Sequence, residues 1–114
     1  MSDDMPTFDA YISPLLRLLA DRPEGVSTSE AYEEVADTVG LSDEQRDELL
    51  PSGRQPVYEN RIGWAHDRLK RADLSHNKER GVWQLTEDGR RLAEAYPDGL
   101  PDRVTEQIAR PRND

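Results

Sequence analysis

The fold is decided by residues 56–85, which read PVYENRIGWAHDRLKRADLSHNKERGVWQL. In the first half of this segment apolar residues recur at helical spacing, which predicts a long helix over 56–72. The side chains expected to face the core are Tyr58, Ile62, Ala65, Leu69 and Ala72. From residue 74 the pattern changes to two short runs around a polar turn, and the second run is Val82-Trp83-Gln84-Leu85. This change of period predicts a β-hairpin over 74–85.

Three helices are predicted before this segment. Residues 7–21 carry one apolar stripe at helical spacing. A second helix begins at Ser27, which stands at capping-box spacing from Glu30, and it ends at Gly40. Ser42 then starts a short acidic helix that leads into the turn before residue 56.

A last helix is predicted after the hairpin, over 87–96, with Thr86 as its cap. The side chains expected to be buried there are Leu92 and Ala95. Residues 97–114 are polar and are predicted to form a tail or linker, within which Val104 and Ile108 have the spacing of a short helix.

The order of these elements is helix, helix, short helix, long helix, hairpin and helix. This is the order of a helix-turn-helix with a β-wing, in which the long helix is the recognition helix. We therefore expect a mainly α fold with a small β-hairpin, a winged helix-turn-helix domain spanning 5–96.

Composition limits the class of protein. The chain has 114 residues, enough for one domain, and it has no cysteine for disulfides or thiol catalysis. No run of apolar residues is long enough to span a membrane. The first residues, Met1-Ser2-Asp3-Asp4, are acidic and do not resemble a secretory signal, so we expect a cytoplasmic protein.

Charge is distributed unevenly along the chain. The formal net charge is −9, and residues 1–50 hold 13 Asp and Glu against 3 Lys and Arg. Residues 51–91 reverse this balance, with 9 basic residues against 6 acidic ones. Nucleic-acid binding follows the local field, so the basic segment around the long helix is expected to contact DNA.

Arginine replaces lysine almost throughout, because only Lys70 and Lys78 are lysines among 15 basic residues. This bias, with the excess of Asp and Glu, is typical of a salt-adapted proteome or a GC-rich genome, although ordinary compositional drift explains it as well. High salt weakens phosphate contacts, so a salt-adapted DNA reader would rely more on base and apolar contacts.

The long helix carries one predicted DNA-binding strip, whose residues recur at alternating spacings of three and four. Its members are Arg61, Trp64, Arg68 and Arg71. Guanidinium groups beside an indole suit phosphate contacts next to a stacking surface. The alternative is that Trp64 is half-buried packing and the arginines are merely solvated.

The turn before the long helix supplies further candidates, because a helix N-terminus favours phosphate. These candidates are Ser52, Gly53, Arg54 and Gln55, followed by Asn60 one turn into the helix. In the major groove Arg pairs with guanine, and Gln or Asn pairs with adenine. The alternatives are ordinary turn chemistry at Ser52-Gly53 and an Asn60 that meets only water.

Lys78 and Arg80 lie at the predicted wing, which in this fold follows the DNA backbone or enters the minor groove. Exposed charge on a turn is the simpler alternative. Trp83 is expected to pack between the wing and the helices.

No pattern in the chain supports catalysis, a cofactor or a metal site. A restriction-nuclease core needs acidic metal ligands with an acid-x-Lys arrangement. The residues two positions before Lys70 and Lys78 are Arg68 and His76. His66 and His76 lack the partners and spacing of a zinc site.

Four short runs resemble one family. The runs are Leu50-Pro51-Ser52-Gly53-Arg54, Asn60-Arg61-Ile62-Gly63-Trp64-Ala65, Arg80-Gly81-Val82-Trp83 and Leu85-Thr86-Glu87-Asp88-Gly89-Arg90. Over residues 6–95 the chain is similar to the N-terminal winged-helix domain of Mrr-type restriction endonucleases, which are modification-dependent and type IV-like. The chain departs from that family at His66-Asp67, where the family tends to have Arg or another uncharged or basic pair.

The resemblance implies that this domain recognises double-stranded DNA, while a separate C-terminal nuclease domain cuts modified, often methylated, sites. Because Asn and Gln suit adenine, N6-methyladenine is favoured slightly over 5-methylcytosine. Two other functions stay open. One is a stand-alone, dimeric winged-helix transcription regulator, and the other is a winged helix that contacts protein through the acidic residues 1–50.

Overall fold

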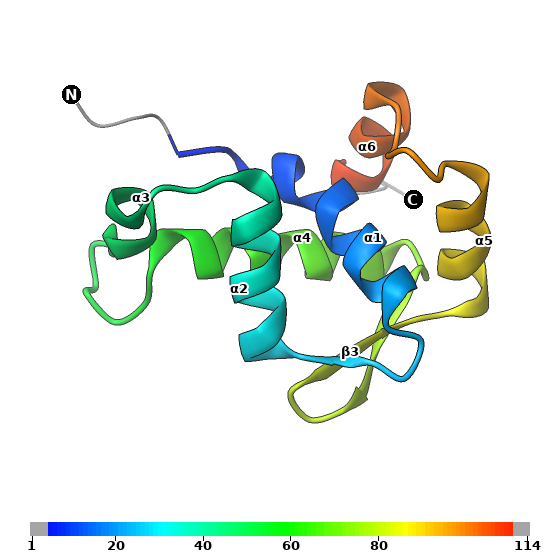
Figure 1. Cartoon of the computed structure of the whole chain (residues 1–114), viewed down its shortest axis with the longest axis horizontal. Helices are drawn as coiled ribbons and strands as arrows, with labels where there is room; N and C mark the ends of the chain where they lie inside the picture. The colour runs from blue at the N-terminus through cyan, green and yellow to red at the C-terminus, as the bar shows by residue number, and fades with distance from the viewer. Residues whose placement is uncertain (1–4, 111–114) are drawn as a thin grey trace.

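The structure, a computed structural model, describes residues 5–110 (Figure 1). In this range the chain forms helices around a small antiparallel sheet whose strand order is β1-β3-β2. The helices are the 3-10 turn η1 (Phe8–Tyr11), α1 (Ile12–Asp21), α2 (Thr28–Val39), α3 (Asp43–Asp47), α4 (Val57–Arg71), α5 (Glu87–Ala95) and α6 (Asp102–Ala109). The strands are β1 (Val26–Ser27), β2 (Ser75–Glu79) and β3 (Val82–Leu85).

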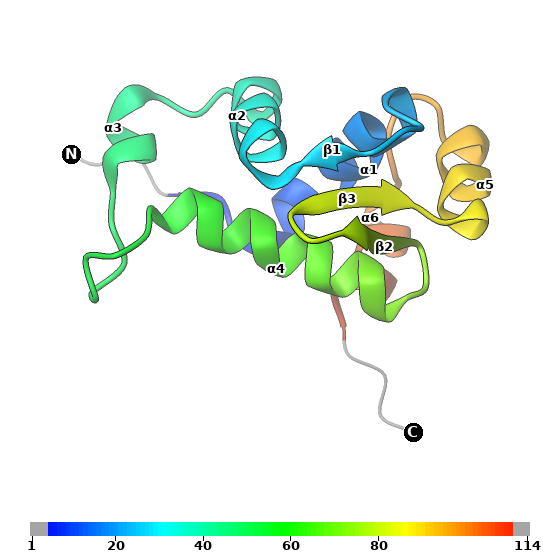
Figure 2. The same ribbon diagram turned by 90° about the horizontal axis from the view of Figure 1, so that it is seen from below.

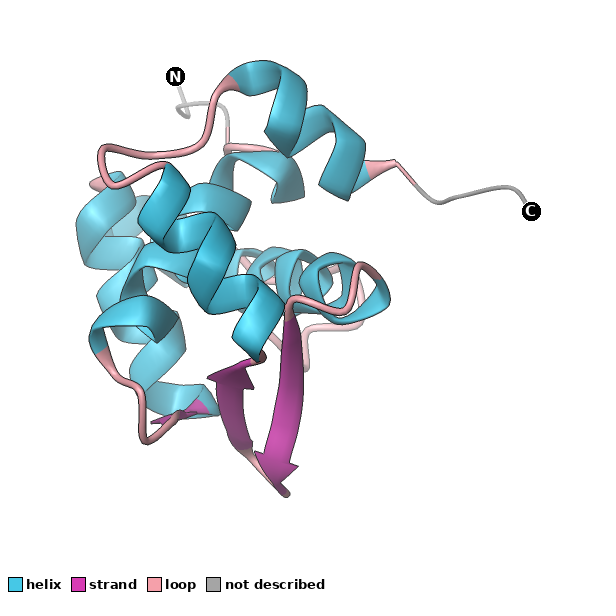
Figure 3. Ribbon diagram, turned by 90° about the vertical axis from the view of Figure 1, so that its right-hand side faces the viewer, coloured by secondary structure: helices cyan, strands magenta, loops and turns pink. Residues whose placement is uncertain are grey.

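The predicted order of elements and the predicted fold class are confirmed. The chain is a winged helix: α4 is the long helix, and the β2–β3 hairpin that follows it is the wing, which extends away from the helices (Figure 3). Strand β1 was not predicted, because two residues are too few to show a period. It pairs with β3 through Val26 opposite Trp83 and thus makes the hairpin part of a three-stranded sheet.

The core forms around α1, whose apolar stripe is almost fully buried and which contacts α2, α4 and α5. Its inward side chains are Ile12, Leu15, Leu16 and Leu19, and the buried Tyr11 at the end of η1 joins them. From α4, Ile62, Ala65 and Leu69 meet this stripe, as the helical spacing predicted. Burial of each such side chain contributes on the order of 1.5–3 kcal/mol, so α1 positions α4 through ordinary hydrophobic packing.

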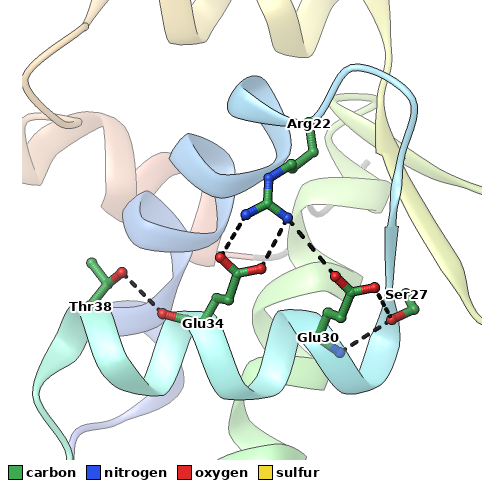
Figure 4. Close-up of polar contacts among 5 residues, drawn as sticks. All are labelled: Arg22, Ser27, Glu30, Glu34 and Thr38. Atoms are coloured by element: carbon green, nitrogen blue, oxygen red, sulfur yellow. Dashed lines mark hydrogen bonds and ion pairs between the residues drawn. The ribbon is translucent and has the colours of Figure 1, made fainter.

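The predicted cap of α2 is present and is joined to the end of α1 by an ion-pair cluster (Figure 4). The Ser27 hydroxyl accepts a hydrogen bond from the Glu30 backbone N–H at 3.3 Å. The Arg22 guanidinium donates two hydrogen bonds to Glu34, at 2.8 and 3.0 Å, and lies 4.0 Å from Glu30. The cluster fixes the angle at which α2 leaves the loop after α1.

Some predicted core positions differ in the structure. Ala72 ends α4 on the exposed side, and in α5 Ala95 is exposed while Ala93 is buried. Ala72 follows the last residue of α4, and the buried face of α5 is formed by Gly89 and Ala93, with Leu92 partly buried. The segment predicted to be a tail or linker contains α6, which contacts α4, α1 and η1 and buries Ile108 to 8% exposure.

The start of α5 is fixed by close contact with the turn before the hairpin. The Thr86 hydroxyl accepts a hydrogen bond from the Gly89 N–H at 3.1 Å and donates one to the Asp73 carbonyl at 2.7 Å. A Cβ on Gly89 would lie 2.0 Å from the Leu74 carbonyl oxygen. Since that neighbour is backbone, only glycine fits here without moving α5.

Gly89→Ala is therefore expected to destabilise the domain by about 1–3 kcal/mol, the range for overpacking a tight site. The measurement is urea unfolding followed by circular dichroism. Glu94→Ala, an exposed change in the same helix, is the matched control and should stay near wild type. Equal stability of the two variants would contradict the packing account.

Candidate nucleic-acid interface

The solvent face of α4 is the central feature of the candidate interface. Asn60, Trp64, Asp67 and Arg71 follow each other at spacings of four, three and four, so they form one line along the outer side of the helix. Trp64 is 48% exposed and, with Leu49, is one of the two large apolar side chains that the described residues leave exposed. The Arg71 Nε donates a hydrogen bond to Asp67 at 2.8 Å.

Two adjoining cavities run beside this face, and we call them together the α4 groove. The cavity near the wing measures about 470 Å³ and is lined by Ser27, Thr28, Ser29, Tyr32, Glu33, Tyr58, Glu59 and Gly81. The cavity farther along α4 measures about 330 Å³ and is lined by Tyr32, Gln55, Glu59, Asn60, Gly63, Trp64 and Asp67. Tyr32 and Glu59 line both, so the two cavities adjoin each other beside α4. Figure 2 shows how α2, α4 and the wing are arranged.

The groove combines aromatic rings, amides and carboxylates. Burial raises the pKa of Tyr32 and of Tyr58 above the usual value, so both hydroxyls stay protonated and can donate. Glu33, Glu59 and Asp67 place acceptors on the same surface. Such a surface suits hydrogen-bond donors and flat or apolar groups better than it suits phosphate.

The loop before α4 is held by backbone contacts and presents its side chains outward. Leu50 N donates to the Gln55 carbonyl at 2.9 Å, and Gly53 N donates to the Leu50 carbonyl at 2.7 Å. Gly53 has a φ of +71°, a conformation that favours glycine. Ser52 and Arg54 are exposed, and the Gln55 side chain accepts a hydrogen bond from Asn60 at 3.5 Å.

The two basic residues of the wing differ in their contacts. Lys78 donates from Nζ to the Glu24 carbonyl at 2.8 Å and so links the wing to the loop before β1. Arg80 lies exposed at the turn between β2 and β3, and within residues 5–110 its guanidinium makes no hydrogen bond or ion pair.

The predicted strip of Arg61, Trp64, Arg68 and Arg71 is divided in the structure. Arg61 Nη1 donates to the carbonyls of Met5 and Pro6, at 3.0 and 2.8 Å. The Arg68 guanidinium lies 5.6 Å from the ring centres of both Phe8 and Trp64. These two arginines thus hold the N-terminal segment against α4, and only Trp64 and Arg71 belong to the outer face.

Several groove residues were missed by the sequence analysis: Tyr32, Glu33, Glu59, Gly63 and Asp67. Glu59, Gly63 and Asp67 recur every four residues beside Asn60 and Trp64, so the helical period could have found them. Tyr32 comes from α2, and no local pattern joins it to α4. Among residues 5–110 no three His, Asp or Glu side chains gather to hold a metal ion, and none of the helices there is long and apolar enough to cross a membrane.

Comparison with known proteins identifies the family of the chain. The chain matches the family described as the Mrr N-terminal domain over residues 8–95, which is most of its length. The chain belongs to that family. The resemblance expected from the four sequence runs is thereby confirmed.

One relative of this Mrr N-terminal domain is the Type IV methyl-directed restriction enzyme EcoKMrr of Escherichia coli (strain K12). The two are 46% identical over 105 residues, which is 92% of this chain and 34% of that enzyme. The chain thus spans about a third of the length of this relative. No solved structure matches it.

Trp83 connects the elements of the interface in this Mrr N-terminal domain. Its indole on β3 stacks on His66 of α4, with ring centres 4.1 Å apart and planes within 7°. Tyr32 of α2 meets the same indole edge-on at 6.0 Å. His66 is only 4% exposed, and burial, followed by the charge of Lys70, lowers its pKa from 6.5 to about 4.

This pKa makes the stability of the domain depend on pH. Because His66 gains a proton near pH 6.5 when unfolded but only near 4 when folded, stability falls as the pH drops between these values. From about pH 7 to about pH 5 this group should cost about 2 kcal/mol. In His66→Phe, which keeps an aromatic ring, urea unfolding at both pH values should show this loss removed. An unchanged loss in the variant would contradict a buried, neutral His66.

Proposed function

We propose that this Mrr N-terminal domain binds double-stranded DNA, with the outer face of α4 in the major groove and the wing along the backbone. The observation that carries the proposal is the half-exposed Trp64, which lies on the outer face of α4 and lines the α4 groove. An α-helix fits the major groove, and the helix N-terminus favours phosphate.

The proposed contacts fall into two classes. Backbone contacts come from the exposed residues before α4 and on the wing, which are Ser52, Gly53, Arg54, Lys78 and Arg80. Base-edge contacts come from Gln55, Asn60 and Trp64, with Arg71 free to reach DNA if it leaves Asp67. Arg61 and Arg68 act indirectly, because they hold the N-terminal segment against α4.

The family and the relative support a place in a restriction system. The relative is named a methyl-directed restriction enzyme, and this chain corresponds to about a third of it. We propose that the domain is the part that recognises modified DNA, and that a nuclease domain elsewhere in the native protein makes the cut. In this scheme the domain supplies sequence and modification preference, and the cleavage chemistry lies outside the chain.

Arg54 and Arg80 provide the sharpest test of the docking surface, because both are exposed and stand at the loop and the wing that flank α4. Arg54→Ala with Arg80→Ala should weaken duplex binding about equally for all sequences and lower the salt slope of log affinity by about 2. The measurement is fluorescence anisotropy with a labelled duplex over a range of salt concentrations.

The matched control removes the same charge from exposed positions on α5 and α6, in Arg90→Ala with Arg103→Ala. This control should keep the wild-type salt slope. Equal slopes in both double variants would place the DNA elsewhere on the domain.

The preference for a methylated base is tested by one random-sequence duplex pool prepared unmodified, with N6-methyladenine or with 5-methylcytosine. A methyl group covered by Trp64 gains about 0.8 kcal/mol, which is about a four-fold preference. We expect the adenine-methylated pool to bind best, because Asn60 and Gln55 suit adenine. Equal affinity for the three pools at matched salt would leave a general DNA-binding domain.

A further inference from the structure

Gly63 lies in the middle of α4, and nothing in the fold requires a glycine there. Its φ is outside the positive range that five other glycines adopt. A Cβ built on Gly63 would meet no atom within 4 Å. Gly89, the other helical glycine discussed above, is different, because its Cβ would collide with the Leu74 carbonyl oxygen.

A glycine inside a helix lowers stability relative to alanine, because the unfolded chain gains more conformational freedom. At Gly63 the domain bears this loss without any packing or backbone advantage within residues 5–110. A residue that lowers stability and brings no compensating contact within the fold is expected at functional positions. The space left open at Gly63 is therefore available to a molecule that approaches α4 from outside.

The surroundings of Gly63 indicate which kind of molecule this is. Gly63 lines the 330 Å³ cavity of the α4 groove, with Glu59 and Asp67 one turn away on either side and Tyr32 opposite on α2. The two carboxylates repel phosphate but accept hydrogen bonds from amino groups. Trp64 and Tyr32 add ring surfaces that can cover a flat or methylated edge.

We infer that Gly63 is a specificity-determining residue, whose missing side chain lets the edge of a base approach the backbone of α4. The base is one with an exocyclic amino group on its major-groove edge, adenine or cytosine, and Glu59 or Asp67 accepts the hydrogen bond from that group. The inference rests on the proposed binding of DNA and adds the position and the chemistry of the contact. The phosphate contacts of the loop and the wing are separate from it.

The experiment uses the whole chain with the variants Gly63→Ala and Gly63→Leu and the three duplex pools described above. Gly63→Ala should raise Tm by roughly 4 °C, because helix propensity improves in open space. The same variant should bind the preferred pool about ten-fold more weakly, since a methyl group intrudes on the base edge. Gly63→Leu should bind more weakly still, and both variants should keep the wild-type salt slope, because the phosphate contacts are intact.

Gln107→Ala is the control, an exposed and uncharged change on α6 that lines neither cavity, and it should bind all pools as wild type does. If Gly63→Ala lowers Tm, the glycine serves the fold and the inference is overturned. If Tm rises while duplex affinity is unchanged, the inference fails and the proposed function stands. If the wild-type chain binds none of the pools, the proposed function fails and the inference fails with it.

Discussion

The arrangement of α2, α4 and the wing depends on one indole. Trp83 on β3 packs face to face with His66 of α4 and edge to face with Tyr32 of α2, so the wing, the long helix and the helix before it meet at a single side chain. Aromatic pairs of this geometry contribute about 0.5–1.5 kcal/mol each beyond the area they bury. The stack also requires a neutral His66, since a charge there would be desolvated. The contacts that bury the His66 ring therefore also set the relative position of α2, α4 and the wing.

Several basic residues near α4 bind other groups of the protein, and the groove beside α4 is acidic. The sequence places most of the basic residues between 51 and 91, but the fold engages several of them internally: Arg61 on backbone carbonyls, Arg68 between two rings and Lys78 on Glu24. The groove itself is lined by carboxylates. A surface of this composition has little attraction for phosphate alone, so the proposed discrimination between bases would depend on short-range contacts. The acidic composition of the whole chain has the same consequence, because its long-range attraction for phosphate is weak.

Features that depend on neighbouring residues could be predicted from the sequence, whereas contacts between distant segments could not. Caps at Ser27, Ser42 and Thr86 and the period of α4 depend on neighbours a few residues away, and all were found. The partners of Arg61 lie more than fifty residues earlier in the chain, so spacing along α4 could not distinguish a brace from a free cation. Strand β1 is visible only through its pairing with β3, and α6 only through its contacts with α1, α4 and η1. The helical period placed Trp64 on a surface strip, but whether its ring would be exposed or half-buried was decided by tertiary contacts.

The wing is held to the rest of the domain along β3 and near its turn. β1 pairs with β3, Gln84 and Lys78 donate to the carbonyls of Pro23 and Glu24 at 2.8 Å each, and Thr28 N donates to the Gly81 carbonyl at 2.9 Å. An isolated two-stranded hairpin is marginally stable in water, whereas this one is ordered before any partner arrives. The entropy of ordering the hairpin is therefore lost during folding and not during association. Such a preorganised wing can engage a partner in a rigid-body encounter, without a slow conformational step.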